Sequence, residues 1–83
     1  MAYHKNIIPR GTFGDFCKIT EEYKELEDAF TQNNNILELC EMADLIGAIA
    51  GYSKKHYNIT LDQLVKMTKA TEDAFIHGER QKK

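Results

Sequence analysis

Residues 19–48 read ITEEYKELEDAFTQNNNILELCEMADLIGA, and this stretch decides the fold. Its first part continues an apolar pattern whose members lie three or four residues apart, as they do on one face of a helix. The members of this pattern are Phe13, Phe16, Ile19, Tyr23, Leu26 and Phe30. Residues 32–35 then interrupt it, because Asn favours turns and helix caps over helix interiors. The stretch predicts a helix that begins from Phe13, a short Asn-rich turn and a second helix antiparallel to the first.

Capping signals place the beginnings of the second and third helices. Asn35 and Glu38 have the spacing of a capping box, so we expect the second helix to begin with Asn35 as its N-cap. This helix should reach Tyr52 or a few residues beyond. After a short break, Thr60 and Gln63 repeat the capping-box spacing and predict the start of a third helix.

The third predicted helix carries one apolar stripe and a stop signal. The stripe consists of Leu61, Leu64, Val65, Thr68, Phe75 and Ile76. Gly78 follows it at the position where glycine commonly ends a helix. The sequence contains no alternation typical of β-strands and no internal repeat. It therefore predicts an all-α fold, a short bundle of three to four helices over residues 13–78, between an N-terminal arm (1–12) and a tail (79–83).

The length of the chain predicts self-association. A chain of 83 residues buries only about 60% of the surface that its unfolded form exposes, and small domains often complete their core by oligomerisation. The second helix is apolar over much of its circumference. The residues turned away from its Leu37 side are Cys40, Ala43, Ile46 and Ala50. We therefore expect a homodimer or homotetramer, in which a neighbour completes the bundle.

Composition narrows the class of protein. The net charge of −2 and the pI near 5.9 argue against nucleic acid as a partner. No apolar run approaches the ~18 residues that span a bilayer, so no membrane is expected either. Cys17 and Cys40 both fall in helical patterns and no secretory signal precedes them. This usage predicts two reduced, buried thiols in a cytoplasmic protein.

Two carboxylates of the second helix lie where apolar side chains are expected. With about 100° per residue and Leu37 at zero, Glu41 falls at about 40° and Asp44 at about −20°, within the apolar face. An ionised carboxylate buried without a partner is strongly unfavourable, so such groups are paired or bind a metal. Glu41 and Asp44 therefore predict either a metal site or a buried ion pair with a Lys or Arg of another helix.

Glu22 and Glu25 repeat the same one-turn spacing on the first helix. Taken alone, they would form a solvated helix face. Two antiparallel helices would bring this pair face to face with Glu41 and Asp44. Four oxygen donors without His or Cys form the ligand set of a hard cation, Mg²⁺ or Mn²⁺. A di-iron carboxylate bundle is excluded, because it requires Glu-x-x-His pairs and the chain contains none.

Residues 21–26 (EEYKEL) and 41–45 (EMADL) resemble the E-E-x-x-E … E-x-x-D signature of the MazG-like superfamily of all-α nucleoside-triphosphate pyrophosphohydrolases. That superfamily includes MazG itself, phosphoribosyl-ATP pyrophosphohydrolases, and the dimeric dUTP and dCTP pyrophosphatases. Residues 14–48 and 67–80 are also similar to small phage-encoded relatives, so the resemblance covers roughly residues 11–80. It implies four metal ligands, namely Glu22, Glu25, Glu41 and Asp44.

The resemblance also implies an activity. This is the hydrolysis of an NTP or dNTP to the monophosphate and pyrophosphate, with Mg²⁺ as cofactor and control of the nucleotide pool as the role. A phage-encoded member would act in the cytoplasm of the host. Glu21 or Glu38 could be the general base for the attacking water, although Glu38 fits the capping box better. Family members often carry a Lys and an Asn after the second acidic pair, and the candidates for phosphate binding in this chain are Lys54, Lys55 and Lys69.

Three alternatives stay open from the sequence. The substrate could be phosphoribosyl-ATP instead of a nucleoside triphosphate. The chain could also be a non-catalytic helical interaction module that kept the fold and lost the activity. Glu21 could form an ion pair with Lys18 or Lys24, each one turn away.

Overall fold

The computed structural model describes residues 7–77, and this range contains three helices. They are α1 (Phe16–Thr31), α2 (Asn35–Tyr57) and α3 (Leu61–His77). There is no strand between residues 7 and 77, so the predicted all-α class is confirmed. Gly78, the expected C′ residue, lies outside the described residues, as do the tail 79–83 and the first part of the arm (1–6).

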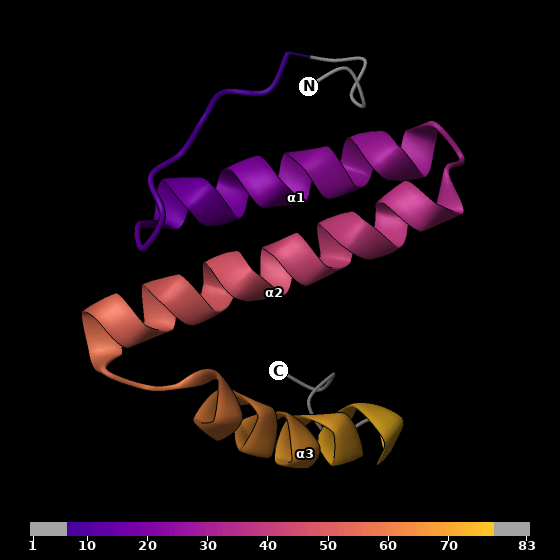
Figure 1. The fold of residues 1–83 in the computed structure, drawn as a ribbon. Helices are drawn as coiled ribbons and strands as arrows, with labels where there is room; N and C mark the ends of the chain where they lie inside the picture. Colours follow the sequence, from indigo (N-terminus) through magenta and orange to yellow (C-terminus); the bar gives the residue numbers. More distant parts are fainter. Residues whose placement is uncertain (1–6, 78–83) are drawn as a thin grey trace.

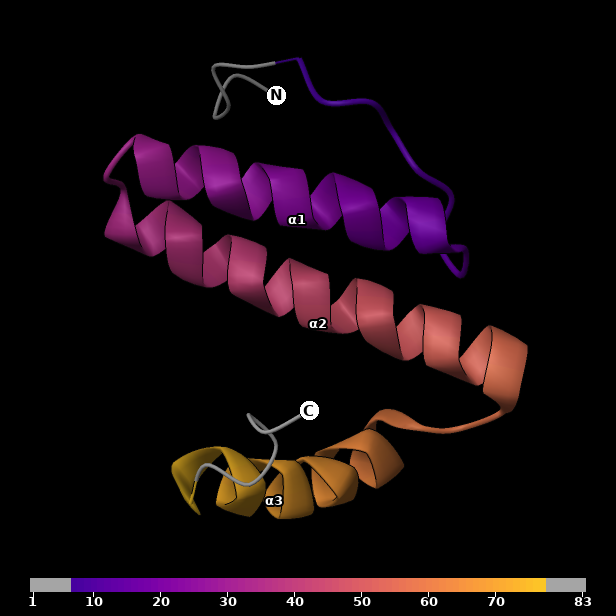
Figure 2. The same cartoon turned by 180° about the vertical axis from the view of Figure 1, so that it is seen from behind.

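The three helices form a layered arrangement with α2 in the middle. α1 and α2 lie side by side and antiparallel, and α3 turns back along the far side of α2 (Figures 1 and 2). The described part of the arm runs along the opposite side of α1 in both views. α2 packs mainly against α1, while α3 touches α2 only in small part. The two acidic motifs therefore belong to the two helices that share the main interface of the monomer.

The Asn-rich turn joins α1 to α2. Asn33 takes the left-handed conformation, with φ of 60°, and Asn34 accepts a hydrogen bond on its side chain from the Leu37 N–H at 3.0 Å. Asn34 is therefore the N-cap of α2, and the prediction of Asn35 was wrong by one residue. The backbone of Asn34 is extended (φ −107°, ψ 98°), which lets its carboxamide reach the free N–H groups of the first turn. Glu38 consequently does not complete a capping box with Asn35.

The cap of α3 agrees with the prediction. The Thr60 N–H donates to Gln63 Oε1 at 2.7 Å, and the Gln63 N–H donates to Thr60 Oγ1 at 3.2 Å. This reciprocal pattern is that of a capping box. α2 ends just before it at Asn58, whose left-handed backbone (φ 57°) closes the helix. The predicted break between the second and third helices is thus confirmed.

α1 begins at Phe16, after Gly14, whereas the sequence predicted that it would begin at Phe13. Gly14 lies in a turn with φ of 95°, a conformation that does not occur inside a right-handed helix. The Phe13 ring instead packs against Gly51 of α2. A Cβ atom added to Gly51 would lie 2.5 Å from the Cζ atom of Phe13. Asp15 follows as the N-cap residue, and its Oδ1 lies 2.6 Å from the Nζ of Lys55 on α2. These contacts fix the segment before α1 to the end of α2.

The interior of the monomer is made of acids and small residues. Among the described residues, the buried hydrophobic side chains are Ala29 and Ala48. The buried polar residues are Glu21, Glu22, Asp28, Glu41 and Ser53. The aromatic residues of the predicted stripe on α1 are instead exposed, and Tyr23, for example, is 53% exposed. The reason is rotational: Glu22 and Ala29 share the face that meets α2, and Tyr23 lies about 100° further around the helix.

The two cysteines are free and exposed, so the prediction of buried thiols was wrong. Cys17 lies on the side of α1 near the arm, where the Thr12 N–H donates to its sulfur at 3.2 Å. Cys40 lies on α2, about 100° around the helix from the buried Glu41. Neither cysteine is covered by the contact between α1 and α2. None of the described helices is long and apolar enough to cross a membrane.

Candidate metal centre

Five carboxyl groups of α1 and α2 form two overlapping groups. In a first group, Glu22, Glu41 and Asp44 each offer a carboxylate oxygen, and these atoms lie within 4.8 Å of one another. By the same measure, Glu21, Glu22 and Glu25 form a second group, and Glu22 links the two. We call these five residues the acidic cluster. The structure therefore brings together all four residues that the sequence suggested as metal ligands.

The burial of these acids differs from the predicted order. Glu22 and Glu41 are 6% and 5% exposed, whereas Glu25 is half-buried and Asp44 is exposed. The sequence placed Glu41 and Asp44 within the apolar face and, taken alone, left Glu22 on a solvated one. Glu41 is buried as predicted, whereas Asp44 is exposed and Glu22 is buried. The line of contact between the helices runs through Glu22 and Glu41. Asp44 lies at its edge, because it is about 60° from Glu41 around α2.

Glu22 has one paired oxygen and one buried oxygen without a donor. Its Oε2 lies 3.1 Å from the Nζ of Lys18. Its Oε1 is buried and accepts no hydrogen bond within the described part of the chain. A buried acceptor without a donor costs about 1–3 kcal/mol, and more when it is charged. A cation placed among Glu22, Glu41 and Asp44 would remove that cost.

Glu25 shows how much negative charge is concentrated in the acidic cluster. Burial raises the pKa of Glu25 from 4.5 to about 7, with further contributions from the carboxylates of Glu22 and Glu41 and from a hydrogen bond with Glu41. Near neutral pH, Glu25 therefore holds a proton for a large part of the time. A proton on Glu25 and the ammonium of Lys18 together offset part of the charge of the metal-free cluster.

Glu21 is engaged on the side of α1 that faces the arm. The Gly11 N–H donates to Glu21 Oε1 at 2.7 Å, and Lys18 Nζ donates to the same oxygen at 3.0 Å. Burial raises the pKa of Glu21, but the hydrogen bonds from Gly11 and Lys18 outweigh this effect and hold the pKa below its usual value. Glu21 thus stays ionised and ties the arm to α1.

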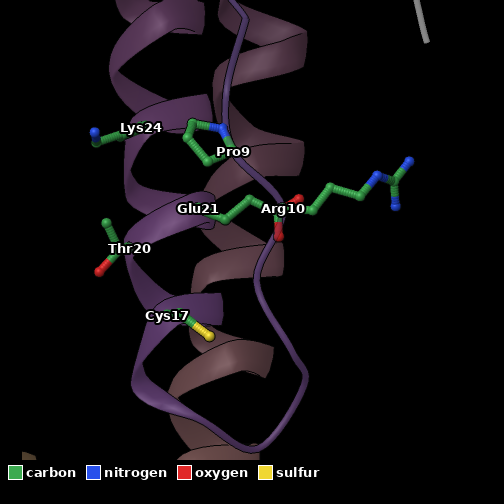
Figure 3. A pocket seen from close by; sticks show the side chains of 6 residues that line it. All are labelled: Pro9, Arg10, Cys17, Thr20, Glu21 and Lys24. Atoms are coloured by element: carbon green, nitrogen blue, oxygen red, sulfur yellow. The ribbon is translucent and has the colours of Figure 1, made fainter.

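A small cavity of about 170 Å³ lies between the arm and α1. Figure 3 shows the side chains that line it, which are Pro9, Arg10, Cys17, Thr20, Glu21 and Lys24. Glu21 reaches from α1 toward the arm and is the one member of the acidic cluster among them (Figure 3). The other acids of the cluster are not among the residues that line it. We therefore place the candidate site at the interface of α1 and α2 and not in this cavity.

Two of the three lysines predicted for phosphate binding are engaged near the end of α2 and not at the acidic cluster. Lys54 donates to the side chain of the Asn that ends α2 at 2.7 Å, and Lys55 is paired with Asp15 at 2.6 Å. Lys55 follows Asp44 by three helical turns, about 16 Å along the axis. Lys69 lies on α3, which contacts α2 only in small part. A phosphate role for these lysines stays a prediction.

Within residues 7–77, Lys18 does reach the acids, and the sequence did not single it out as a substrate-binding residue. Its spacing was the available signal, because residues three and four positions apart share a helix face and Glu21 and Glu22 stand at those positions. Glu38, the second candidate for the general base, lies one turn before Glu41 and is half-buried. It belongs to neither group of the acidic cluster.

The acidic cluster fits a hard divalent cation. Its donors are all carboxylate oxygens, and one ion could contact Glu22, Glu41 and Asp44 together because their oxygens lie within 4.8 Å of one another. The buried Glu22 Oε1 without a donor is the direct sign that a positive partner suits this place. Mg²⁺ and Mn²⁺ prefer oxygen ligands, and Mg²⁺ usually keeps several waters for a substrate to replace. Glu25 is adjacent and would complete the α1 side of such a site.

The resemblance to the MazG-like superfamily rests on the two acidic motifs and on the all-α frame that brings them together. Comparisons of the chain with family models, with curated proteins and with solved structures found no significant match.

Proposed function

We propose that this chain is a divalent-metal-dependent pyrophosphohydrolase that converts a nucleoside triphosphate to the monophosphate and pyrophosphate. The observation that carries the proposal is the convergence of Glu22, Glu41 and Asp44, whose carboxylate oxygens lie within 4.8 Å of one another between two helices. The residues and their spacing resemble the metal motif of the MazG-like superfamily. Mg²⁺ is the proposed cofactor, and Mn²⁺ would serve in its place.

The proposed mechanism begins from charge. The acidic cluster alone would repel a triphosphate, and Mg²⁺ bound there would supply the positive charge that attracts the phosphate groups. Glu22, Glu25, Glu41 and Asp44 would hold the ion. Water attacks the α-phosphorus and forms a new P–O bond, while the bond from that phosphorus to the bridging oxygen breaks. Pyrophosphate leaves, and a carboxylate accepts the proton of the attacking water.

Glu21 and Glu38 are the proposed general bases. Glu21 is ionised, but its Oε1 is already hydrogen-bonded by Gly11 and Lys18. Glu38 is half-buried one turn before Glu41, and no ion pair of it with another described residue is present. We therefore favour Glu38 as the base and assign Glu21 the task of holding the arm.

The substrate class and the cellular role follow from the resemblance. We favour an NTP or dNTP and a role in control of the nucleotide pool, with phosphoribosyl-ATP as the alternative substrate. The cytoplasm, that of a host cell if the chain is phage-encoded, is the compartment in which the free thiols of Cys17 and Cys40 would stay reduced. The rival function is a non-catalytic helical interaction module. The assembly of the acidic cluster favours the enzyme.

A panel of nucleotides tests the proposal. The protein is incubated with NTPs, dNTPs and phosphoribosyl-ATP in Mg²⁺, and the products are separated by ion-exchange chromatography. We expect at least one nucleotide to give monophosphate and pyrophosphate, and expect EDTA or Glu41→Gln to stop this release. Glu27→Gln changes an exposed acid of α1 and should keep full activity. Turnover of no nucleotide, or full activity of Glu41→Gln, would refute the assignment.

We also propose that the protein works as a homodimer or homotetramer. Among the described residues, the buried hydrophobic side chains are Ala29 and Ala48 alone, so the monomer has almost no apolar core of its own. Large apolar side chains are exposed on all three helices. Self-association would therefore supply the apolar core that the monomer lacks.

The proposed contact surface between copies is the side of α2 that carries exposed apolar residues. Ile36, Leu39 and Ile46 are 78%, 65% and 51% exposed there, and they lie within about 80° of one another around the helix. Leu39→Glu is expected to convert the oligomer to a monomer in sedimentation equilibrium, because it would bury an unpaired charge in the interface. Ile7→Glu, at a fully exposed position of the arm (100%), is the control. A wild-type protein that sediments as a monomer at high micromolar concentration would contradict the proposal.

A further inference from the structure

Lys18 places a positive charge directly against the acidic cluster. Its Nζ lies 3.0 Å from Glu21 Oε1 and 3.1 Å from Glu22 Oε2, so one ammonium bridges two neighbouring carboxylates. The bridge is built into α1, because residues three and four positions apart share a helix face. The Lys18 side chain is 25% exposed. Its ammonium therefore borders both the buried acids and the solvent.

The Lys18 bridge and a divalent cation would compete for the same carboxylate. Glu22 is the acid common to both groups of the cluster, and its Oε2 is in contact with Lys18. A cation held by Glu22, Glu41 and Asp44 would stand close to the ammonium. Two positive charges in contact with the same carboxylate would repel each other strongly, because the site is only partly exposed to solvent. The long and flexible side chain of Lys18 allows the ammonium to move into solvent.

We propose that Lys18 is the resident counter-ion of the metal-free site, and that a divalent cation displaces its ammonium from Glu22. The inference rests on the proposed metal site and is independent of which nucleotide is hydrolysed. In the metal-free protein, Lys18 limits the repulsion between Glu21 and Glu22 and keeps Glu22 directed toward α2. Lys18 thus offsets part of the charge of the metal-free cluster and gives way when the metal binds.

The exchange has a thermodynamic signature that an ordinary ion pair lacks. The Lys18 bridge stabilises the metal-free protein, and this stabilisation is lost when the metal binds. Removing the ammonium should therefore destabilise the metal-free protein and tighten metal binding by the same factor. A purely structural ion pair would lower stability and leave the metal affinity unchanged or weaker.

Titration with Mn²⁺ alone, followed by electron paramagnetic resonance, tests the proposal. Lys18→Met is expected to bind Mn²⁺ about threefold to tenfold more tightly than the wild type, given the modest strength of partly exposed ion pairs. Its Tm should be lower in EDTA and equal to that of the wild type in saturating Mn²⁺. Lys18→Arg keeps the charge and should behave like the wild type. Lys24→Met, at an exposed position on the same helix, is the matched control and should change neither quantity.

The two proposals fail in different ways. A wild-type protein that binds no Mn²⁺ would overturn the metal site and the exchange together. Normal binding by the wild type with unchanged or weaker binding by Lys18→Met would overturn the exchange alone. If Lys18→Met does not fold, the ammonium signals of the wild type are followed by NMR during addition of Mg²⁺. The Lys18 signal should then shift to that of a solvated lysine while the Lys24 signal stays in place, and an unmoved Lys18 signal would overturn the exchange.

Discussion

Glu22→Gln is expected to abolish tight divalent-cation binding and to reduce pyrophosphate release by more than about 100-fold. Loss of an outer partner of a metal ligand already costs roughly 10- to 100-fold, and Glu22 belongs to both groups of acids. The substitution preserves the volume of a side chain that is 6% exposed. It removes the charge and turns one oxygen into an NH₂ group, which cannot bind a cation. The effect is therefore one of ligand chemistry and not of packing.

Two measurements check the Glu22→Gln prediction. Titration with Mn²⁺ gives the affinity, and thermal unfolding in EDTA and in Mg²⁺ gives the stability. In EDTA the variant loses the ion pair with Lys18 but also a buried charge without a full set of partners, so its Tm should stay close to that of the wild type. Mg²⁺ should raise the Tm of the wild type and of Glu27→Gln, but not that of Glu22→Gln. Wild-type affinity in Glu22→Gln would show that the acidic cluster is not the metal site.

Glu25→Gln is expected to stabilise the metal-free protein at pH 8 while it weakens metal binding at least about tenfold. The pKa of Glu25 is raised from 4.5 to about 7, so the folded state binds this proton more tightly than the unfolded state. Stability therefore falls as the pH rises between these two values, and the full penalty is present above them. The side chain of glutamine does not titrate, so the Glu25→Gln variant avoids this penalty. With solvent screening of this half-buried group, we expect a gain of about 5 °C in Tm, the shift that roughly 1 kcal/mol produces in a small domain.

The pH dependence provides the check on Glu25→Gln. In EDTA, the Tm difference between the variant and the wild type should be small at pH 5 and should grow toward pH 8. In saturating Mg²⁺ the order should reverse at pH 8, because the bound cation favours the ionised carboxylate that only the wild type has. A Tm difference in EDTA that does not change between pH 5 and pH 8 would contradict the raised pKa.

The helices and one of the caps could be predicted because their signals are local. The capping box of Thr60 and Gln63 needs only two side chains at the right spacing, and the structure contains it. The Asn-rich turn was equally visible. The sequence could not show that Asn34 and not Asn35 is the N-cap, because consecutive Asn residues are chemically identical and only the backbone angles distinguish them.

The meeting of the two acidic pairs followed from the antiparallel helices, but their burial did not. A helical wheel gives the directions of side chains relative to one another, and it does not say which direction meets the next helix. On α1 the aromatic residues mark the face that would normally be the core, yet Tyr23 is exposed and Glu22 is buried. A single sequence does not distinguish an apolar face that packs within the molecule from one that stays exposed on it.

The two buried alanines have a consequence for the choice of cation. Ala29 and Ala48, 0% and 3% exposed, follow Glu22 and Glu41 by seven residues each and so lie on the same faces, two turns away. Side chains of one carbon at this contact let the helix axes approach toward the short end of the usual range of about 8–10 Å. A close approach of the two carboxylate-bearing faces would suit an ion bound at about 2.0–2.1 Å, such as the proposed Mg²⁺, better than Ca²⁺ at about 2.3–2.6 Å. The smallest side chains of the interface would therefore select the ion by its radius, although they never touch it.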